Sequence, residues 1–292
     1  MVQKAQMAIS PLDEQAALTR IAQVRDFPML TGAVQRLLEI IHTEIESERE
    51  IETIILYDQV LSARILRVAN SAFYGARGSI GTISRAMLQI GLEEVRSICL
   101  CYLLMQLCSD DGRFEELERE RLWKHAFTTA KIASEISRKR PWISAEKAYV
   151  CGLLHDFGRV AMAYTFGEHH RAISGLADLR GVPAWYIELQ YGLTHTTIGR
   201  WIATKWSLPE VFQRVMEFHH QPEKSPSYGP EVRLVALADI LANADRFPSL
   251  LDDPQTHAVC RELYIADEEW DDYQGALAEI RLQVDQFWNL LK

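Results

Sequence analysis

Apolar residues recur at helical spacing through almost the whole chain, and this periodicity limits the possible folds more than any other feature. Val34, Leu37, Leu38, Ile41 and Ile45, for example, lie on one face of a helix with 3.6 residues per turn. No segment shows the sustained alternation of apolar and polar residues between turn signals that is typical of strands. We therefore predict an all-α fold.

The periodicity predicts two groups of helices. In the first part of the chain they cover residues 11–24, 31–45, 49–57 and 60–71, and the segment GLEEVRSICLCYLLMQLC, with large side chains on both faces, predicts a central helix. In the second part they cover residues 115–139, 144–156, 168–180, 194–206, 209–220, 229–246 and 268–291. Prolines lie between these helices or at their starts, where proline is tolerated.

A polar run from Cys108 to Arg113 separates the two groups. We place a domain boundary there, between a helical N-terminal lobe, residues 1–110, and a second helical lobe with a C-terminal helical extension, residues 111–292. Because the run is short, we expect the N-terminal lobe to pack on the second lobe.

Composition and charge exclude several classes of partner. Hydrophobic residues make up 48% of the chain and charged residues 24%, as in ordinary globular proteins. The net charge of −9 repels phosphate backbones, and no cluster of Lys and Arg resembles a nucleic-acid or anionic-membrane patch. We expect neither a nucleic-acid nor a membrane partner.

The sequence also favours a cytoplasmic location. The N-terminal segment has no apolar stretch of signal-peptide length, and nowhere do about 18 uncharged apolar residues run together. The five cysteines form no CxxC pair, and four of them lie in apolar segments of helical periodicity. Disulfides are therefore not expected.

Four ionisable side chains of the second lobe lie within or at the end of apolar helices, where a polar group needs a partner. They are His125, His155, Asp156 and Asp239. Imidazole and carboxylate groups supplied by several helices suit a divalent transition metal such as Fe, Mn, Ni, Co or Zn. His125 precedes His155 by 30 residues, and Asp156 precedes Asp239 by 83.

This H…HD…D pattern resembles the HD superfamily of metal-dependent phosphohydrolases. The segments GLLHDFGR, LTHTTIGRWIATKWSLP and HHQP, with ILYDQVLSARILRVANSAFYG and ISRAMLQIGLEEVRSICL, are similar to the HDOD (HD-related output domain) branch, which is related to HD-GYP proteins. The resemblance covers about residues 27–245. It implies one or two metal ions held by His125, His155, Asp156, His195, His219, His220 and Asp239, with Asp156 and Arg159 as the candidate catalytic residues.

The sequence departs from the HD-GYP pattern in informative places. Those relatives, which hydrolyse cyclic di-GMP, have a Lys where this chain has Arg159, and Arg binds phosphate but does not readily exchange a proton. Nothing after His219 and His220 resembles a GYP motif. Arg121 stands where trinuclear relatives have a Glu, and Glu120 lies about 100° further round the helix.

Several of these residues also have a structural interpretation. His195 would cap a helix start beside Thr194, and Asp239 would pair with Arg246. One of His219 and His220 would face solvent, because adjacent helical residues differ by about 100° in direction.

Two further expectations concern residues outside this set. We expect Asn70 to close a helix end by hydrogen bonding, and His42, His169 and His170 to lie on the surface.

The resemblance implies two functions of different classes. The first is a bacterial signal-transduction protein without established catalysis, which binds a metal, a nucleotide or a signalling protein partner. The second is a metal-dependent phosphohydrolase, in which two metal ions would act on a phosphate ester or nucleotide. The candidate ligands favour the enzyme, whereas Arg159 and the lack of a GYP motif favour regulation. A scaffold with an empty site is a third interpretation, and whether the protein is an enzyme stays open.

Overall fold

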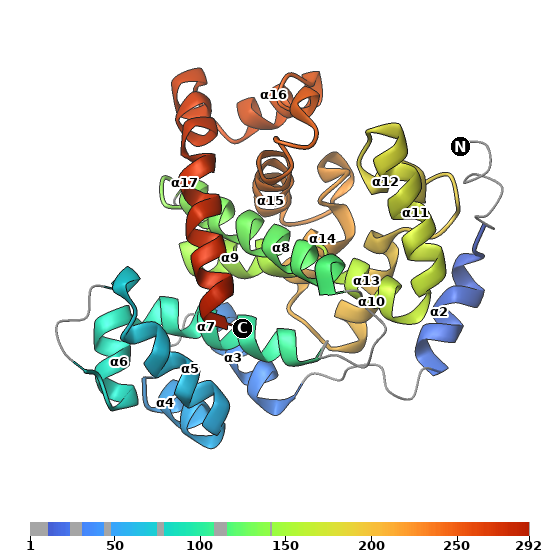
Figure 1. Cartoon of the computed structure of the whole chain (residues 1–292). Coiled ribbons are helices and arrows are strands. Elements are labelled where there is room, and N and C mark those ends of the chain that lie inside the picture. Colours follow the sequence, from blue (N-terminus) through green and yellow to red (C-terminus); the bar gives the residue numbers. More distant parts are fainter. Residues whose placement is uncertain are drawn as a thin grey trace. The chain divides into compact units, whose positions relative to one another are not determined.

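The regular elements of the described chain are all helices (Figure 1). The computed structural model describes residues 11–23, 31–43, 48–74, 79–107, 116–140 and 142–291. Within these ranges there is no strand, so the prediction of an all-α fold is confirmed. None of the described helices combines the length and the apolar character needed to cross a membrane.

Contacts between Cα atoms divide the chain into two units, which are described separately. The large unit comprises residues 1–27 and 110–281, and the small unit comprises residues 28–109 and 282–292. In the middle of the chain the two units meet between residues 109 and 110, one residue from the expected boundary between residues 110 and 111. At both ends it differs, because residues 1–27 belong with the second part of the chain and residues 282–292 with the first. The polar run Cys108–Arg113 lies outside the described residues.

The contacts of the two ends explain this difference. Near the start of the chain, the backbone N–H of Leu12 donates to the carbonyl of Tyr191 at 3.0 Å, and the Arg20 guanidinium lies over the Phe166 ring, within the large unit. Near its end, Arg67 donates to the carbonyl of Leu290 within the small unit. None of these three contacts has a signal in the local sequence pattern.

The large unit contains most of the helices. They are α2 (Glu14–Gln23), α8 (Glu116–Ser137), α9 (Ala145–Leu154), α10 (Phe157–Thr165), α11 (Gly167–Arg180), α12 (Ala184–Glu188), α13 (His195–Lys205), α14 (Glu210–Phe218), α15 (Gly229–Ala242), α16 (Pro254–Glu262) and the part of α17 (Asp267–Leu291) that ends at Arg281. Two short 3-10 helices, η2 (Pro222–Lys224) and η3 (Pro248–Leu250), follow α14 and α15.

The centre of the large unit is formed by α8, α9 and α15, which pack against one another (Figure 1). In α15 apolar residues occupy nearly every position, so that Val232, Leu234, Val235 and Leu237 are all fully buried. Gly152 in α9 permits the close approach to α8, because a Cβ atom there would lie 2.6 Å from the Cα atom of Ala130.

Around this centre, α10 packs against α13, and α13 against α14. Gly158 in α10 faces the start of α13, where an added Cβ atom would lie 1.9 Å from the carbonyl oxygen of His195. Only glycine fits this approach, which brings the turn before α10 next to the first residue of α13.

The small unit is built around α7 (Leu92–Leu107), which contacts α3 (Gly32–Thr43), α4 (Glu48–Tyr57), α5 (Gln59–Ala69) and α6 (Ile83–Ile90). Val95, Ile98 and Leu104 of α7 are fully buried. The expected central helix is therefore confirmed. The short helix η1 (Ala72–Tyr74) follows α5.

Asn70 ends α5 and anchors the chain that follows. Its side chain donates to the carbonyls of Leu66 at 2.8 Å and Ile80 at 2.9 Å, and accepts from the backbone N–H of Ile80 at 2.8 Å. The expected structural role of Asn70 is confirmed.

Candidate metal centre

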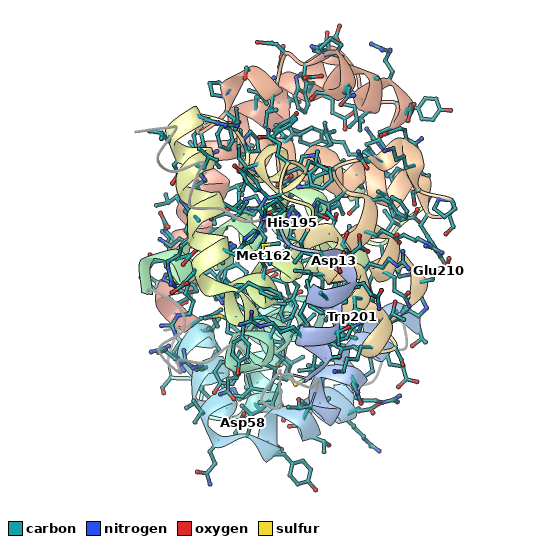
Figure 2. All side chains as sticks on the ribbon, turned by 90° about the vertical axis from the view of Figure 1, so that its right-hand side faces the viewer. Asp13, Asp58, Met162, His195, Trp201 and Glu210 are labelled. Carbon is teal, nitrogen blue, oxygen red and sulfur yellow. The ribbon has the colours of Figure 1, made fainter. Side chains whose placement is uncertain are left out.

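Seven polar side chains of the large unit meet in its interior, although they come from five separate segments. They are His125 of α8, His155 and Asp156 of the turn between α9 and α10, His195 at the start of α13, His219 and His220 just after α14, and Asp239 of α15. In Figure 2 His195 lies among the side chains in the middle of this unit, whereas Glu210 lies at its periphery. The sequence set is therefore brought together in full, and the role of its members as ligands stays a prediction.

The first cluster consists of His125, His155 and Asp239. The Nε2 atom of His125 lies 3.3 Å from Nε2 of His155 and 3.0 Å from Oδ1 of Asp239. The same carboxylate oxygen lies 3.6 Å from Nε2 of His155. Two imidazole nitrogens and one carboxylate oxygen thus point at a common centre.

The second cluster consists of Asp156, His195, His219 and His220. Oδ1 of Asp156 lies 3.0 Å from Nε2 of His195 and 3.6 Å from Nε2 of His219. The two Nε2 atoms are 3.3 Å apart. His220 belongs to the cluster through a ring nitrogen, and Trp185 of α12 stacks on its ring at 4.8 Å between centroids.

Asp156 connects the two clusters. While its Oδ1 atom faces the second cluster, its Oδ2 atom lies 3.6 Å from Nε2 of His125 and 3.7 Å from Nε2 of His155. Asp239 makes a weaker connection, because its Oδ2 atom lies 3.7 Å from Nδ1 of His220. The arrangement suits two ions that share a carboxylate, or one ion in either cluster.

The hydrogen bonds of the imidazole rings test whether a metal fits. Nδ1 of His155 lies 2.6 Å from the carbonyl of Gly152, and Nδ1 of His219 lies 2.9 Å from that of Val215. Nδ1 of His195 lies 2.5 Å from a carboxylate oxygen of Glu188. Because these oxygens only accept, each Nδ1 carries a proton, and in a neutral ring Nε2 then presents a lone pair.

In each cluster two Nε2 atoms face each other at 3.3 Å. Burial lowers the pKa of His155 and of His195, but the neighbouring carboxylates outweigh it and raise the pKa of His155 and that of His195, the latter to about 8. In each pair a proton on Nε2 therefore holds the place between the two rings that a metal cation would take. Metal-ligating histidines commonly donate their second ring N–H to a carbonyl or carboxylate, which is the pattern observed here. The residues therefore fit a divalent metal, and the two clusters suggest a metal site.

Charge at the site agrees with this donor set. Burial raises the pKa of Asp156, but Arg159, His155 and His195 outweigh it and hold that pKa well below the usual range. The pKa of Asp239 is likewise lowered, because hydrogen bonds from His125 and His155 outweigh its burial. The carboxylates are therefore ionised at neutral pH.

The histidines that follow α14 respond to burial in the opposite sense. Burial is the main cause that lowers the pKa of His219 and holds that of His220 well below its usual range. Both rings are therefore neutral near pH 7, which is the form that binds metal.

Arg159 stands beside the shared carboxylate. Its Nε atom lies 2.8 Å from Oδ2 of Asp156, and only 16% of its side chain is exposed. A buried guanidinium at this place can bind a phosphate oxygen, although in this structure it is held by Asp156.

The structural roles considered for His195 and Asp239 are not those that the structure shows. His195 is the first residue of α13, but the cap is Thr194, whose side chain accepts from the backbone N–H of Thr197. Asp239 does not pair with Arg246, which bonds to Asp178 instead.

The expectation that one of His219 and His220 faces solvent is wrong. Both lie in the second cluster, and 15% of the His220 side chain is exposed. The expectation assumed that the helix continues, whereas α14 ends at Phe218 and the pair lies in the turn after it.

The surface location that we expected for His170 is also wrong. Its side chain is buried, and its Nε2 atom lies 2.8 Å from Oε1 of Glu118 on α8. Nothing in the segment around His170 points to a partner 52 residues earlier in the chain. His169 and His42 are partly buried.

Two residues around the clusters were not predicted. Asn243, one turn after Asp239, donates to its Oδ1 atom at 2.8 Å and to its carbonyl at 3.0 Å. Glu188, the last residue of α12, is fully buried and bonds to His195. A single acid within the apolar segment AWYIELQ was the one available signal for Glu188.

Comparisons with known proteins agree with the fold. A family model described as HDOD domain matches residues 27–222. An uncharacterized protein of Treponema pallidum (strain Nichols) is 25% identical over 224 residues, which are 75% of this chain and 42% of that protein. The chain thus spans less than half the length of this curated relative.

Solved structures are similar over almost the whole chain. An HDOD domain protein of unknown function from Geobacter sulfurreducens has a TM-score of 0.77 and 26% identity, over 94% of this chain and 99% of its own. A candidate phosphohydrolase of Shewanella amazonensis SB2B has a TM-score of 0.71 and 23% identity, over 95% of this chain and 98% of its own. The second likeness concerns the fold alone.

Proposed function

This chain belongs to the HDOD family, and from that premise we propose that it is a bacterial regulatory protein whose large unit binds one or two divalent transition-metal ions. One observation carries the proposal. In each cluster two imidazole Nε2 atoms face each other at 3.3 Å beside an ionised carboxylate. Fe, Mn, Ni, Co and Zn all accept such nitrogen and oxygen donors.

Metal binding would be coupled to the packing of the large unit, which supports a regulatory role. The ligands come from α8, the turn before α10, the start of α13, the turn after α14, and α15. An ion held by residues from several of these segments favours one arrangement of the helices over others, because it binds only where the ligands converge. A nucleotide is a second ligand class that would act in the same way.

A signalling protein is the partner that we propose for the output. Large apolar side chains are exposed at the junction of α4 and α5 in the small unit, where Leu56 is 60%, Tyr57 88% and Val60 53% exposed. Exposed apolar groups that lie close together are typical of protein contact sites. We place this function in the cytoplasm, where the four described cysteines, all free and buried, would stay reduced.

Hydrolysis of a phosphate ester or a nucleotide is the second candidate function, and the convergence of the seven candidate ligands favours it. Metal ions bound by the clusters would supply an activated water molecule and hold phosphate oxygens. Arg159 lies beside the shared carboxylate and would neutralise negative charge on the phosphate. Because arginine does not readily exchange a proton, we expect weak activity or none on cyclic di-GMP.

Elemental analysis of the purified full chain tests the leading proposal. We expect about one or two transition-metal ions per chain, and their loss in the double variant with His155→Ala and Asp156→Ala. His170→Gln is the matched control, because this buried histidine bonds to Glu118 and lies outside both clusters. Metal content that is unchanged in the double variant would contradict the proposal.

An activity assay separates the two candidate functions. The metal-loaded protein is incubated with cyclic di-GMP and with bis(p-nitrophenyl) phosphate, and His125→Ala serves as the control. Regulation without catalysis predicts no turnover that depends on His125. Robust turnover that is lost in His125→Ala would favour the phosphohydrolase.

A further inference from the structure

Glu188 is a buried carboxylate that bonds to a ligand histidine without belonging to either cluster. It is the last residue of α12, and none of its surface is exposed. One of its oxygens, Oε2, lies 2.5 Å from Nδ1 of His195 and accepts from the backbone N–H of His195 at 2.9 Å. Both contacts hold the residue that begins α13.

This arrangement differs from those of the other two histidines whose Nδ1 partners are known. His155 and His219 use backbone carbonyls, of Gly152 and Val215, which the helical backbone supplies. His195 instead uses an ionisable side chain from another helix. A buried carboxylate is costly unless it is paired and hydrogen-bonded, so its place against His195 calls for a specific explanation.

Glu188 accepts from the first backbone N–H of α13, but this contact alone does not account for it, because the same oxygen also meets the imidazole of His195. Thr194 is the N-cap, and its side chain accepts from the backbone N–H of Thr197. The distinctive contact of Glu188 is therefore the one to the imidazole. It fixes the proton on Nδ1 and directs Nε2 toward Oδ1 of Asp156, 3.0 Å away, where a metal ion would replace the proton that Nε2 otherwise shares with this carboxylate.

We propose that Glu188 is a positioning residue of the metal centre, which fixes the tautomer and the orientation of His195 so that Nε2 is available to an ion in the second cluster. This inference rests on the proposed metal-binding function. A carboxylate partner also makes the imidazole a stronger donor, and loss of such a partner typically lowers metal affinity about 10- to 100-fold.

Glu188→Gln is the test variant, and Glu118→Gln is its matched control. Glutamine keeps the size of the side chain and an oxygen for the backbone N–H of His195, but it removes the charge that favours the proton on Nδ1. Glu118 also pairs with a buried histidine of the large unit, at 2.8 Å from Nε2 of His170, and is not part of either cluster. A general loss of packing would affect both variants.

The experiment titrates Zn²⁺ into metal-free full-length protein in competition with a chromophoric chelator. We expect the Zn²⁺ dissociation constant of Glu188→Gln to rise about 10- to 100-fold, and that of Glu118→Gln to change less than about 2-fold. ¹⁵N NMR of the metal-free protein above about pH 9, where the His195 ring is neutral, reports its tautomer. We expect the share of the form with the proton on Nδ1 to fall in Glu188→Gln and to stay unchanged in Glu118→Gln.

The possible failures are distinguishable. If the wild type binds Zn²⁺ and Glu188→Gln binds it equally well with the same His195 tautomer, the positioning role is overturned while metal binding stands. An equal loss of affinity in Glu118→Gln would also overturn it, because the effect would be one of packing. A wild type that binds no Zn²⁺, Co²⁺ or Mn²⁺ would overturn the proposed function and this inference with it.

Discussion

The two units of the chain differ in what their cores contain. In the described part of the small unit the buried polar residues are Arg96 and Ser97, among apolar side chains such as Ile51, Ile65 and Ile98. The described core of the large unit holds many more polar groups. Those of the candidate site are His155, Asp156, Glu188, His195, His219 and Asp239.

The difference teaches which buried groups need an explanation beyond folding. Apolar burial stabilises a helical bundle by itself, whereas a buried carboxylate or imidazole costs free energy unless its partners are in place. The described core of the small unit consists almost entirely of such apolar side chains. In the large unit the polar groups converge on one site, which is the pattern expected where function sets the sequence.

The largest effect that we expect comes from the apolar core. Ile98→Ala removes a fully buried side chain from the middle of α7 and should lower the free energy of unfolding of the small unit by about 2 to 5 kcal/mol. Metal content of the folded protein should not change. Urea denaturation followed by circular dichroism, together with elemental analysis, checks both statements, and a loss of metal in this variant would break the distinction between the units.

A smaller loss of stability should accompany a loss of metal when the packing beneath the candidate site is altered. In Gly158→Ala the new Cβ atom would lie 1.9 Å from the carbonyl oxygen of His195, so α10 and α13 must move apart. We expect a loss of about 2 kcal/mol in stability and at least a tenfold weaker metal affinity.

Gly175→Ala is the control for this variant. It lies within α11, and a Cβ atom there would meet nothing within 4 Å. Because alanine favours helix over glycine, the control should be neutral or more stable by about 0.5 to 1 kcal/mol. Equal metal affinity in Gly158→Ala and Gly175→Ala would show that the approach of α10 to α13 does not position His195.

The same comparison explains what the sequence could predict. Helices with a continuous apolar pattern, such as α7 and α15, were predicted with ends within a few residues of the observed ones. Their burial follows from the apolar residues of the segment itself. The helices that were not predicted are α6, α10, α16 and the short helix α12. α10 begins directly after the turn at His155 and Asp156, and no helix was predicted between the one that ends at residue 156 and the one that begins at residue 168.

The site shows the same division between local and tertiary information. Its seven ionisable residues were singled out from sequence because a polar group in an apolar segment, or a family motif, marks each of them. The partners of those groups could not be predicted. Glu188 meets His195, and Glu118 meets His170, through contacts between helices that no spacing in the sequence encodes.

An ion pair of the large unit outside the site should have an intermediate effect that depends on pH. Glu269 of α17 accepts from Arg140 at 3.0 Å and from the Tyr273 hydroxyl at 2.5 Å. Burial raises the pKa of Glu269, but these hydrogen bonds outweigh it, so the folded-state pKa is below the usual one. The stabilisation is therefore present above the unfolded pKa of about 4.3 and is lost as the pH falls through the folded-state pKa.

Glu269→Gln should accordingly lower the free energy of unfolding by about 1 to 2 kcal/mol at pH 7 and reduce its decline below about pH 4.3. Glu268→Gln is the control, because Glu268 is the exposed neighbour in the same first turn of α17. Chemical denaturation between pH 7 and pH 3 measures both. Parallel pH profiles for wild type and Glu269→Gln would contradict the role given to this pair.

The smallest effect should come from the exposed apolar residues of the small unit, which contribute contact surface without contributing to its core. Tyr57 ends α4 and is 88% exposed, so Tyr57→Ser should change the free energy of unfolding by less than about 0.5 kcal/mol.

Tyr74 offers the contrast within the same unit, because its hydroxyl donates to Glu94 at 3.1 Å, and burial, together with the charge of Glu94, raises the pKa of Tyr74. Tyr74→Phe should therefore cost about 1.5 kcal/mol, measured by the same denaturation. If Tyr57→Ser costs as much as Tyr74→Phe, Tyr57 is part of the folded core in solution and is not available to a partner.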